Sequence, residues 1–283
     1  MPIADPSHER SMSQYTKGKA TICIVNYKTF ELTRLCLRSI RKFTEHPYEV
    51  IVVDNDSADE SLDYLRGVPW ITLLERRAKP GELGGGYAHA AALDLALERC
   101  RTEFFVSMHS DAFVHRQGWL GALLSHFGKN EHIACVGSGK LELIPQWRIL
   151  LKKATDWRTF KRKLLCERDP TGKYRYYNRT ICSLYRTEIL HREALTFVMG
   201  RDEGLTGGKK LYFELEDRGY ETVALPPRTM GKHIIHLAHA TQVINADEFP
   251  VKKRTIAKCR HFMQKAMESE TVRGLLADTS LDR

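Results

Sequence analysis

Several features that would assign a chain quickly to a known class are missing from this sequence. Its seven cysteines include no C-x-x-C pair, and four of them, Cys23, Cys36, Cys135 and Cys182, lie in apolar runs. This pattern argues against a disulfide framework or a zinc ribbon and is typical of reduced core cysteines. No segment reaches the roughly 20 apolar residues that span a bilayer, and the polar N-terminus lacks the apolar core of a signal peptide. We therefore expect a cytoplasmic protein.

A dinucleotide-binding fingerprint is also missing. That fingerprint is G-x-G-x-x-G placed directly between a strand and a helix. In the glycine-rich stretch at residues 81–86, a match that starts at Gly84 and Gly86 puts His89 where the third glycine is needed. An NAD-dependent enzyme is thus a poor match. The glycines could serve either a close approach to a sugar nucleotide or simply the start of a helix.

The charge balance favours an anionic partner. The 283 residues carry 44 Lys and Arg against 35 Asp and Glu, a formal net charge of +9, which suits nucleotides, phospholipid head groups, anionic glycans or nucleic acid. No nucleic-acid-binding module is recognisable, so nucleic acid is not expected. Residues 146–165 predict a basic amphipathic helix, which either lies on a membrane surface or packs on the domain with a solvated basic face.

Strand-like and helix-like segments alternate over the first half of the chain, and this alternation predicts the fold class. Apolar, β-branched runs occupy residues 21–27, 48–55, 70–75, 102–108 and 132–139, with stretches of helical spacing between them. Such a pattern predicts an α/β fold with a mostly parallel central sheet flanked by helices. In sheets of this kind ligands bind beyond the carboxyl ends of the strands.

Two carboxylates are expected at that edge of the sheet. Asp54 could accept hydrogen bonds from a nucleobase or ribose, or could form an Asx turn before a helix with a capping-box pattern of Ser57 and Glu60. Asp111 is better suited to a divalent cation, because Mg²⁺ is held by one or two carboxylates together with substrate phosphates. His109 beside it could be a ligand for a borderline metal such as Mn²⁺, or could point elsewhere.

Three late histidines, His233, His236 and His239, are spaced three residues apart. An extended or irregular loop could aim one of them at a bound metal. Each could equally be a packed side chain of the core.

In their order along the chain, a series of stretches resembles the family 2 glycosyltransferases of GT-A fold. The stretches are TICIVNYKTFELTRLCLRSI, YEVIVVDNDSADESLDYL, GGGYAHAAALDLAL, FFVSMHSDAFV, CSLYRTEIL and GYETVALP followed by HLAHAT. The resemblance covers residues 20–240, so that residues 1–19 are expected to be a flexible tail and residues 241–283 a helical extension. It implies a Rossmann-like GT-A domain, a nucleotide-diphospho-sugar donor and a divalent metal, Mn²⁺ or Mg²⁺.

The resemblance also implies binding roles on the donor side of the site. Asn26, its neighbour Tyr27 and Asp54 would line the nucleoside pocket. Gly85 and Gly86 would lie close to the bound donor.

For the metal and diphosphate, the resemblance points to the stretch HSD. Asp111 would occupy the last position of the family's D-x-D motif, with Ser110 beside it, and His109 stands at the first position. His236 or His239 would match the late histidine that closes on the metal or the diphosphate.

The acceptor side departs from the family pattern. Inverting members use a carboxylate, commonly in an E-D pair, to take the proton from the acceptor hydroxyl. Here Gly207 and Gly208 stand where that pair is expected, so Asp202 or Glu203 is predicted to replace it.

Together these features predict a metal-dependent, inverting hexosyltransferase. Its acceptor would be a hydroxyl group of a glycan, a lipid-linked molecule or a protein. Because the E-D pair is missing, the alternative is a catalytically inactive relative that binds sugar nucleotides or glycans.

Overall fold

The computed structural model describes residues 14–79, 82, 85–139, 141, 157, 164 and 177–283. The predicted basic helix at residues 146–165 lies outside the described residues except for Trp157 and Leu164. Its two interpretations, a membrane contact or packing on the domain, therefore lie outside them too. None of the helices in the described ranges combines the length and the apolar character that crossing a bilayer requires.

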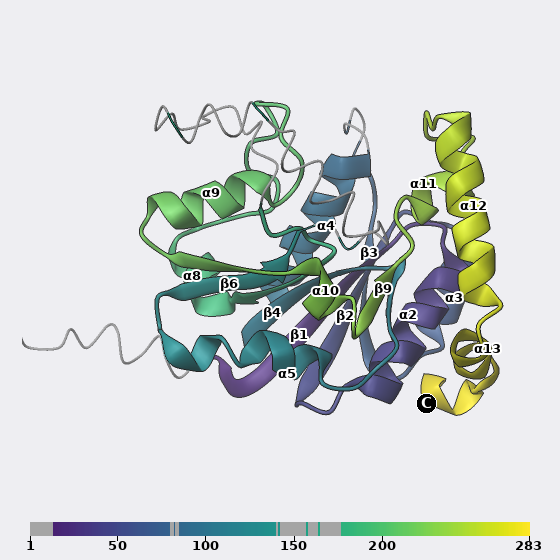
Figure 1. Cartoon of the computed structure of the whole chain (residues 1–283), viewed down its shortest axis with the longest axis horizontal. Helices are drawn as coiled ribbons and strands as arrows, with labels where there is room; N and C mark the ends of the chain where they lie inside the picture. The colour runs from purple at the N-terminus through teal and green to yellow at the C-terminus, as the bar shows by residue number, and fades with distance from the viewer. Residues whose placement is uncertain are drawn as a thin grey trace, which may run out of the picture.

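The described secondary structure matches the predicted alternation (Figure 1). The strands are β1 (Thr16–Asn26), β2 (Tyr48–Asn55), β3 (Ile71–Arg76), β4 (Thr102–His109), β5 (Ala112–Val114), β6 (Ile133–Ser138), β7 (Cys182–Arg186), β8 (Glu221–Leu225) and β9 (Ile234–His236). The helices are α2 (Phe30–Phe43), α3 (Glu60–Arg66), α4 (Gly85–Arg99), α5 (Trp119–Leu124), α8 (Thr187–Arg192), α9 (Lys209–Asp217), α10 (Pro227–Met230), α11 (Ala240–Ile244), α12 (Lys253–Met267) and α13 (Glu270–Ala277), with 3-10 turns η1 (Phe127–Lys129) and η2 (Thr279–Asp282). Because β1 begins at Thr16, residues 16–19 belong to the sheet and not to a flexible tail.

A seven-stranded sheet forms the centre of the fold, with the strand order β3-β2-β1-β4-β7-β6-β8. Neighbouring strands are parallel except at β7, which runs antiparallel to β4 and β6. A second, two-stranded sheet joins β5 to β9. The prediction of an α/β fold with a mostly parallel sheet flanked by helices is confirmed.

Both faces of the sheet are covered by helices, so the central strands are apolar on both sides. In β1, Ile22 and Ile24 enter one core, whereas Cys23 and Val25 enter the core on the opposite face. Helices α2, α3 and α5 cover the first face, and α4, α8 and α9 cover the second. This explains why the strand sequences are continuous apolar runs, as is typical of buried parallel strands.

The C-terminal helices α11, α12 and α13 lie at one edge of the molecule (Figure 1), where they help to form a third core. Side chains of α11, α12 and α13 pack there against α2 and β5. Arg38 of α2 is buried and holds this end of the chain: its Nε donates to Asp282 Oδ1 at 2.8 Å and its Nη1 donates to the carbonyl of Leu275 at 3.3 Å. The hydroxyl of Tyr64 donates to the same Asp282 oxygen at 2.8 Å.

The topology gathers several chain segments at one edge of the sheet. Strands β1, β2 and β4 are parallel, so their carboxyl ends meet there. Because β7 is antiparallel to β4, the segment that leads into β7 arrives at the same edge, and His109 N donates to the carbonyl of Ile181 at 3.1 Å. The candidate site lies at this edge.

Candidate active site

A cavity of about 610 Å³ lies at the carboxyl edge of the sheet. Its volume falls within the roughly 300–1,000 Å³ of small-ligand sites. Eight parts of the chain form the wall: the ends of β1, β2 and β4, the loop after β3, the start of α4, the segments before β7 and before α9, and the stretch from the end of β9 to Phe249.

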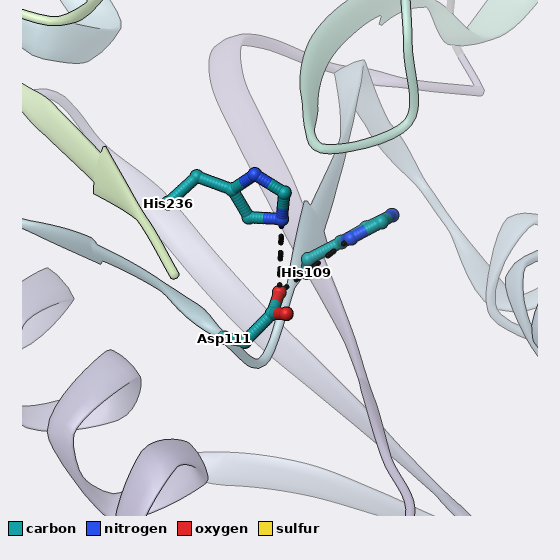
Figure 2. A group of neighbouring side chains, drawn as sticks. All are labelled: His109, Asp111 and His236. Atoms are coloured by element: carbon teal, nitrogen blue, oxygen red, sulfur yellow. Dashed lines mark ion pairs between the residues drawn. The ribbon is translucent and has the colours of Figure 1, made fainter. Parts of the chain in front are cut away.

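Three side chains of the cavity wall lie close together, and Figure 2 shows the ring of His236 pointing towards Asp111 and the ring of His109 beside them, extending away from the other two. His109 ends β4, Asp111 follows it, and His236 ends β9 and is brought alongside by the pairing of β9 with β5. Asp111 Oδ1 lies 3.2 Å from His236 Nε2 and 3.6 Å from His109 Nδ1. The ligand-type atoms of the three residues all lie within 4.8 Å of one another.

The electrostatics of this cluster keep Asp111 ionised. Burial by itself raises the pKa of the Asp111 carboxyl, but His236 and His109 outweigh that effect and hold the pKa well below its usual range. Although the two imidazoles are close, Asp111 Oδ1 is buried without a hydrogen bond. A buried, negatively charged oxygen without a donor, facing two imidazole nitrogens, is a fitting arrangement for a cation between the three groups.

The surrounding contacts fix the orientation of the cluster. Asp111 Oδ2 accepts a hydrogen bond from Ala240 N at 3.3 Å, so the carboxylate is held from the β9 side. On the other side, His109 Nε2 lies 3.3 Å from Thr180 Oγ1. Such outer contacts orient metal-binding histidines, since the second ring nitrogen sets the direction of the first.

One further histidine of the site was not predicted from the sequence. His89, near the start of α4, lines the cavity, and its ring centroid lies 4.8 Å from that of His109. Burial, with a smaller contribution from His109, lowers the pKa of His89 to about 3, so its imidazole is neutral. In the sequence, position 89 stood out for one reason: the dinucleotide-binding fingerprint requires a glycine there, and the chain has His89.

The predicted nucleoside-binding pair Asn26 and Asp54 needs correction, because neither residue lines the cavity. Both are buried, and Asn26 Nδ2 donates to Asp54 Oδ1 at 2.7 Å, while Asp54 Oδ2 accepts from Ser57 N at 3.1 Å. Asp54 therefore stabilises the turn before α3, which was the alternative to its predicted role in nucleoside binding. The neighbouring Asn55 and Asp56 line the cavity instead.

The helix after this turn also begins differently from the prediction. The N-cap of α3 is Asp59, whose carboxylate accepts from Ser61 N at 3.1 Å. Ser57 is not the cap: its hydroxyl accepts from Asn26 Nδ2 at 3.0 Å and from Lys28 N at 3.1 Å. Ser57, predicted as part of a capping box, thus braces the end of β1 instead.

Replacing Asn26 by alanine is expected to lower the free energy of unfolding by about 2 kcal/mol, because it leaves buried polar partners without hydrogen bonds. The affinity for nucleotide should stay within about twofold of wild type, because Asn26 does not line the cavity. Urea unfolding and calorimetric titration measure the two effects. In a control, Asn130→Ala removes two exposed hydrogen bonds, the one that Asn130 Nδ2 donates to Glu221 at 3.1 Å and the one that its Oδ1 accepts from His132 N at 2.9 Å, and should cost less than about 0.5 kcal/mol. A nucleotide affinity lost at unchanged stability would contradict this assignment.

The other residues predicted to bind the donor do lie at the cavity. Tyr27, Gly85, Gly86 and Ser110 all line it, and so does His239, which was predicted as a metal ligand. His239 stands apart from the three-residue cluster: it is exposed, and its Nδ1 lies 3.1 Å from Gln242 Oε1.

A segment of the predicted helical extension also forms part of this wall. Glu248 accepts hydrogen bonds from the Tyr27 hydroxyl and the Lys28 ammonium group. Phe249 lies edge-on to Tyr27, with ring centroids 6.0 Å apart. The C-terminal part of the chain therefore closes the side of the cavity next to β1.

The predicted acceptor bases, Asp202 and Glu203, also need correction. Both are exposed, neither lines the cavity, and Glu203 is paired with Lys210 at 3.1 Å. The part of this loop that reaches the cavity is Thr206 and Gly207. Gly207 must be glycine there, because a Cβ atom would lie 2.9 Å from Ala90 Cβ of α4.

Asp94 of α4 holds the start of that loop and makes its stability depend on pH. Its carboxylate accepts from Phe197 N at 2.6 Å and Val198 N at 3.1 Å, and burial raises the pKa of Asp94 to about 7. Since an unfolded Asp titrates near 3.9, the carboxyl contributes stability that is fully present below about pH 4 and is lost as the pH rises towards 7.

The variant Asp94→Asn isolates this effect, because an amide does not titrate. Between pH 5 and pH 8 we expect the free energy of unfolding of wild type to fall by about 2 kcal/mol relative to the variant. Urea unfolding at both values measures the difference. Asp63→Asn, whose side chain is 80% exposed, serves as a control that should show no such change. If the free energy of unfolding of wild type rose with pH relative to that of the variant, the prediction would be contradicted.

Comparison with known proteins gives the fold a family context. The sequence profile of glycosyl transferase family 2 matches residues 21–192. No curated protein matches the chain in sequence.

Among solved structures, the chain is similar to the mannosyltransferase PcManGT from Pyrobaculum calidifontis, in complex with GDP-Man and Mn²⁺. The identity is 14%, the TM-score is 0.51, and the match covers 97% of this chain and 81% of the other. It is also similar to TarS residues 1–349 of S. aureus, with 14% identity, a TM-score of 0.49 and coverage of 92% and 75%. At this identity the first similarity concerns the fold.

Proposed function

Because the chain belongs to glycosyl transferase family 2 and is a glycosyltransferase, we propose that it uses a nucleotide-diphospho-sugar and a divalent cation held by His109, Asp111 and His236. The observation that carries the proposal is the ionised, buried Asp111 oxygen between two imidazoles at the cavity. Two nitrogen ligands favour Mn²⁺ over Mg²⁺, because Mg²⁺ prefers oxygen ligands in octahedral geometry. The similar mannosyltransferase, whose fold this chain shares, was solved with GDP-Man and Mn²⁺.

The order of strands supports an orientation for the donor. The nucleoside would lie beside Tyr27, Asn55 and Asp56, at the ends of β1 and β2. The diphosphate would reach Asp111 beyond β4, the next strand along the sheet. The cation would supply positive charge that neutralises the diphosphate as it leaves.

The residues around the cluster would hold this geometry during transfer. Ala240 N fixes the Asp111 carboxylate, and Thr180 contacts the ring of His109. Fixed groups of this kind need no reorganisation when charge develops, which is the main source of electrostatic catalysis. We further propose direct displacement by an acceptor hydroxyl with inversion, on a glycan, lipid-linked or protein acceptor. Proton NMR of the first product would show the anomeric configuration.

Donor hydrolysis tests the proposal without knowledge of the acceptor. UDP, GDP and dTDP sugars are first compared with Mn²⁺ in a thermal-shift assay, since a ligand at 100 times its dissociation constant stabilises a native protein by about 2.7 kcal/mol. The most stabilising donor should then release nucleoside diphosphate slowly with Mn²⁺, and EDTA should stop the release. A protein that neither binds nor hydrolyses any donor would refute the proposed function.

A further inference from the structure

One positively charged side chain that lines the cavity, that of Arg179, has no part in the function proposed so far. Arg179 is the one Lys or Arg among the described residues that line the cavity. Within the described part of the chain no carboxylate pairs with its guanidinium, and its Nε is buried without a hydrogen-bond partner. Five donors on a fixed positive charge are costly to leave without acceptors. The side chain therefore calls for an anionic ligand.

The arginine is held firmly in place. Its backbone is tied on both sides, because Arg179 N donates to Ser138 O at 2.9 Å and Ser183 Oγ donates to Arg179 O at 2.7 Å. Its guanidinium carbon lies 5.0 Å from the ring centroid of Tyr177, and the Tyr177 hydroxyl lies 2.9 Å from Thr206 Oγ1. An arginine stacked on a fixed aromatic ring presents its donors in a defined direction.

The position across the sheet shows what this arginine can reach. Arg179 and Thr180 precede β7, which is the neighbour of β4 on the side away from β2. Adjacent strands are roughly 4.8 Å apart, and Thr180 touches His109 directly. The arginine thus lies about one strand beyond the His109–Asp111–His236 cluster.

The charges of the cavity wall are divided in the same direction. Three carboxylates of the wall, Asp56, Glu82 and Glu248, lie next to β1, β2 and β3, where Glu82 is paired with Arg76 and Glu248 with Lys28, so that Asp56 carries the remaining negative charge of that side. Arg179 lies on the β7 side, where the ammonium group of Lys209 also approaches the ring of Tyr177, at 5.5 Å from its centroid. An anionic group is therefore favoured on the β7 side of the cluster.

We propose that Arg179 forms an oxyanion-binding subsite on the β7 side of the His109–Asp111–His236 cluster, with a phosphate or carboxylate group as its ligand. A guanidinium group binds two oxygens of such a group at once, which gives both affinity and orientation. The oxyanion can come from two sources, the diphosphate of the donor or an anionic group of the acceptor. The assignment rests on the proposed function, because the donor supplies the first source.

The variants Arg179→Ala and Arg179→Lys test the subsite, with Arg116→Ala as control because Arg116 is exposed and does not line the cavity. Calorimetry with Mn²⁺ measures the affinity for the most stabilising nucleoside diphosphate and for its nucleoside without phosphates. If the donor diphosphate is the ligand, Arg179→Ala should weaken diphosphate binding at least about tenfold and leave nucleoside binding unchanged. Arg179→Lys, which keeps the charge and loses the second bond, should fall between the alanine variant and wild type.

A second arm detects an acceptor-side oxyanion. Enzyme saturated with Mn²⁺ and nucleoside diphosphate is titrated with sulfate, which imitates a phosphate group, against chloride at equal ionic strength. If the acceptor supplies the anion, sulfate should raise the melting temperature of wild type and Arg116→Ala, and this rise should be lost in Arg179→Ala. The subsite is refuted if Arg179→Ala matches wild type in both arms. Failure of wild type to bind any nucleoside diphosphate would instead refute the proposed function, and sulfate titration of the free enzyme would still test Arg179.

Discussion

Replacing Asp111 by asparagine is expected to reduce Mn²⁺-dependent donor hydrolysis at least about a thousandfold, because removing one preorganised electrostatic contact to a developing charge costs about 10²–10³ in rate and the cation site is lost as well. The amide has nearly the shape of the carboxylate, so its contact with Ala240 N can persist and the fold should be retained. Release of nucleoside diphosphate, measured with and without added Mn²⁺, gives the effect directly.

The matched control for this experiment is Asp63→Asn. The Asp63 side chain is 80% exposed and lies away from the cavity on α3, so the variant should keep full activity. Thermal unfolding of both variants shows whether an activity loss reflects misfolding. Hydrolysis by the Asp111→Asn variant within tenfold of wild type, with the same dependence on Mn²⁺, would overturn the metal assignment.

Replacing Asp282 by alanine is expected to lower the free energy of unfolding by about 3 kcal/mol, the lower end of the range for breaking a buried ion pair. The Arg38 side chain is only 3% exposed, and its charge would lose its carboxylate partner, while Asp282 itself is 21% exposed. The hydroxyl of Tyr64 would lose its acceptor in the same step. Urea unfolding at neutral pH measures the loss.

An exposed ion pair provides the comparison for this variant. Asp63 and Arg66 lie 3.4 Å apart with side chains 80% and 52% exposed, and such pairs contribute about 0–1 kcal/mol. Asp63→Ala should therefore cost less than about 1 kcal/mol. Equal losses from the two alanine variants would mean that the C-terminal turn does not depend on its buried arginine.

The fold could be predicted from the sequence because its signals are local and repeated. The helical spacing at residues 30–43 coincides with α2, and the apolar run at residues 48–55 coincides with β2. Asp111 could be expected at the edge of the sheet for the same reason, since it directly follows a strand. The choice among three late histidines could not be made, because the pairing of β9 with β5 that selects His236 is a tertiary contact.

The two wrong predictions for the donor pocket, Asn26 and Asp54, have a simple geometric cause. Successive side chains of a strand point to opposite sides, so a shift of one residue exchanges a wall residue for a buried one. Val25 and Tyr27 line the cavity, and Asn26 between them does not; likewise Asn55 lines it and Asp54 does not. The sequence located the strand ends, but it did not say which side of the chain would face the ligand.

The course of the loop at residues 197–208, where the acceptor base was predicted, could not be predicted from the sequence for a different reason. Its course depends on the Asp94 carboxylate, which lies far away in the sequence and binds Phe197 N and Val198 N. It also depends on Gly200, Gly204 and Gly208, whose φ angles of 78°, 70° and 75° turn the chain in ways that favour glycine. These features carry Asp202 and Glu203 away from the cavity, whatever their similarity to a catalytic pair.

The attachment of Glu248 to Tyr27 and Lys28 has a practical consequence for anyone who shortens this protein. A fragment cut at residue 240, where the family resemblance stops, would keep every strand of the central sheet and still lack one side of its binding pocket. It would also expose the apolar side chains of α2 that α11, α12 and α13 now cover. The smallest piece worth expressing extends to the final residues of the chain.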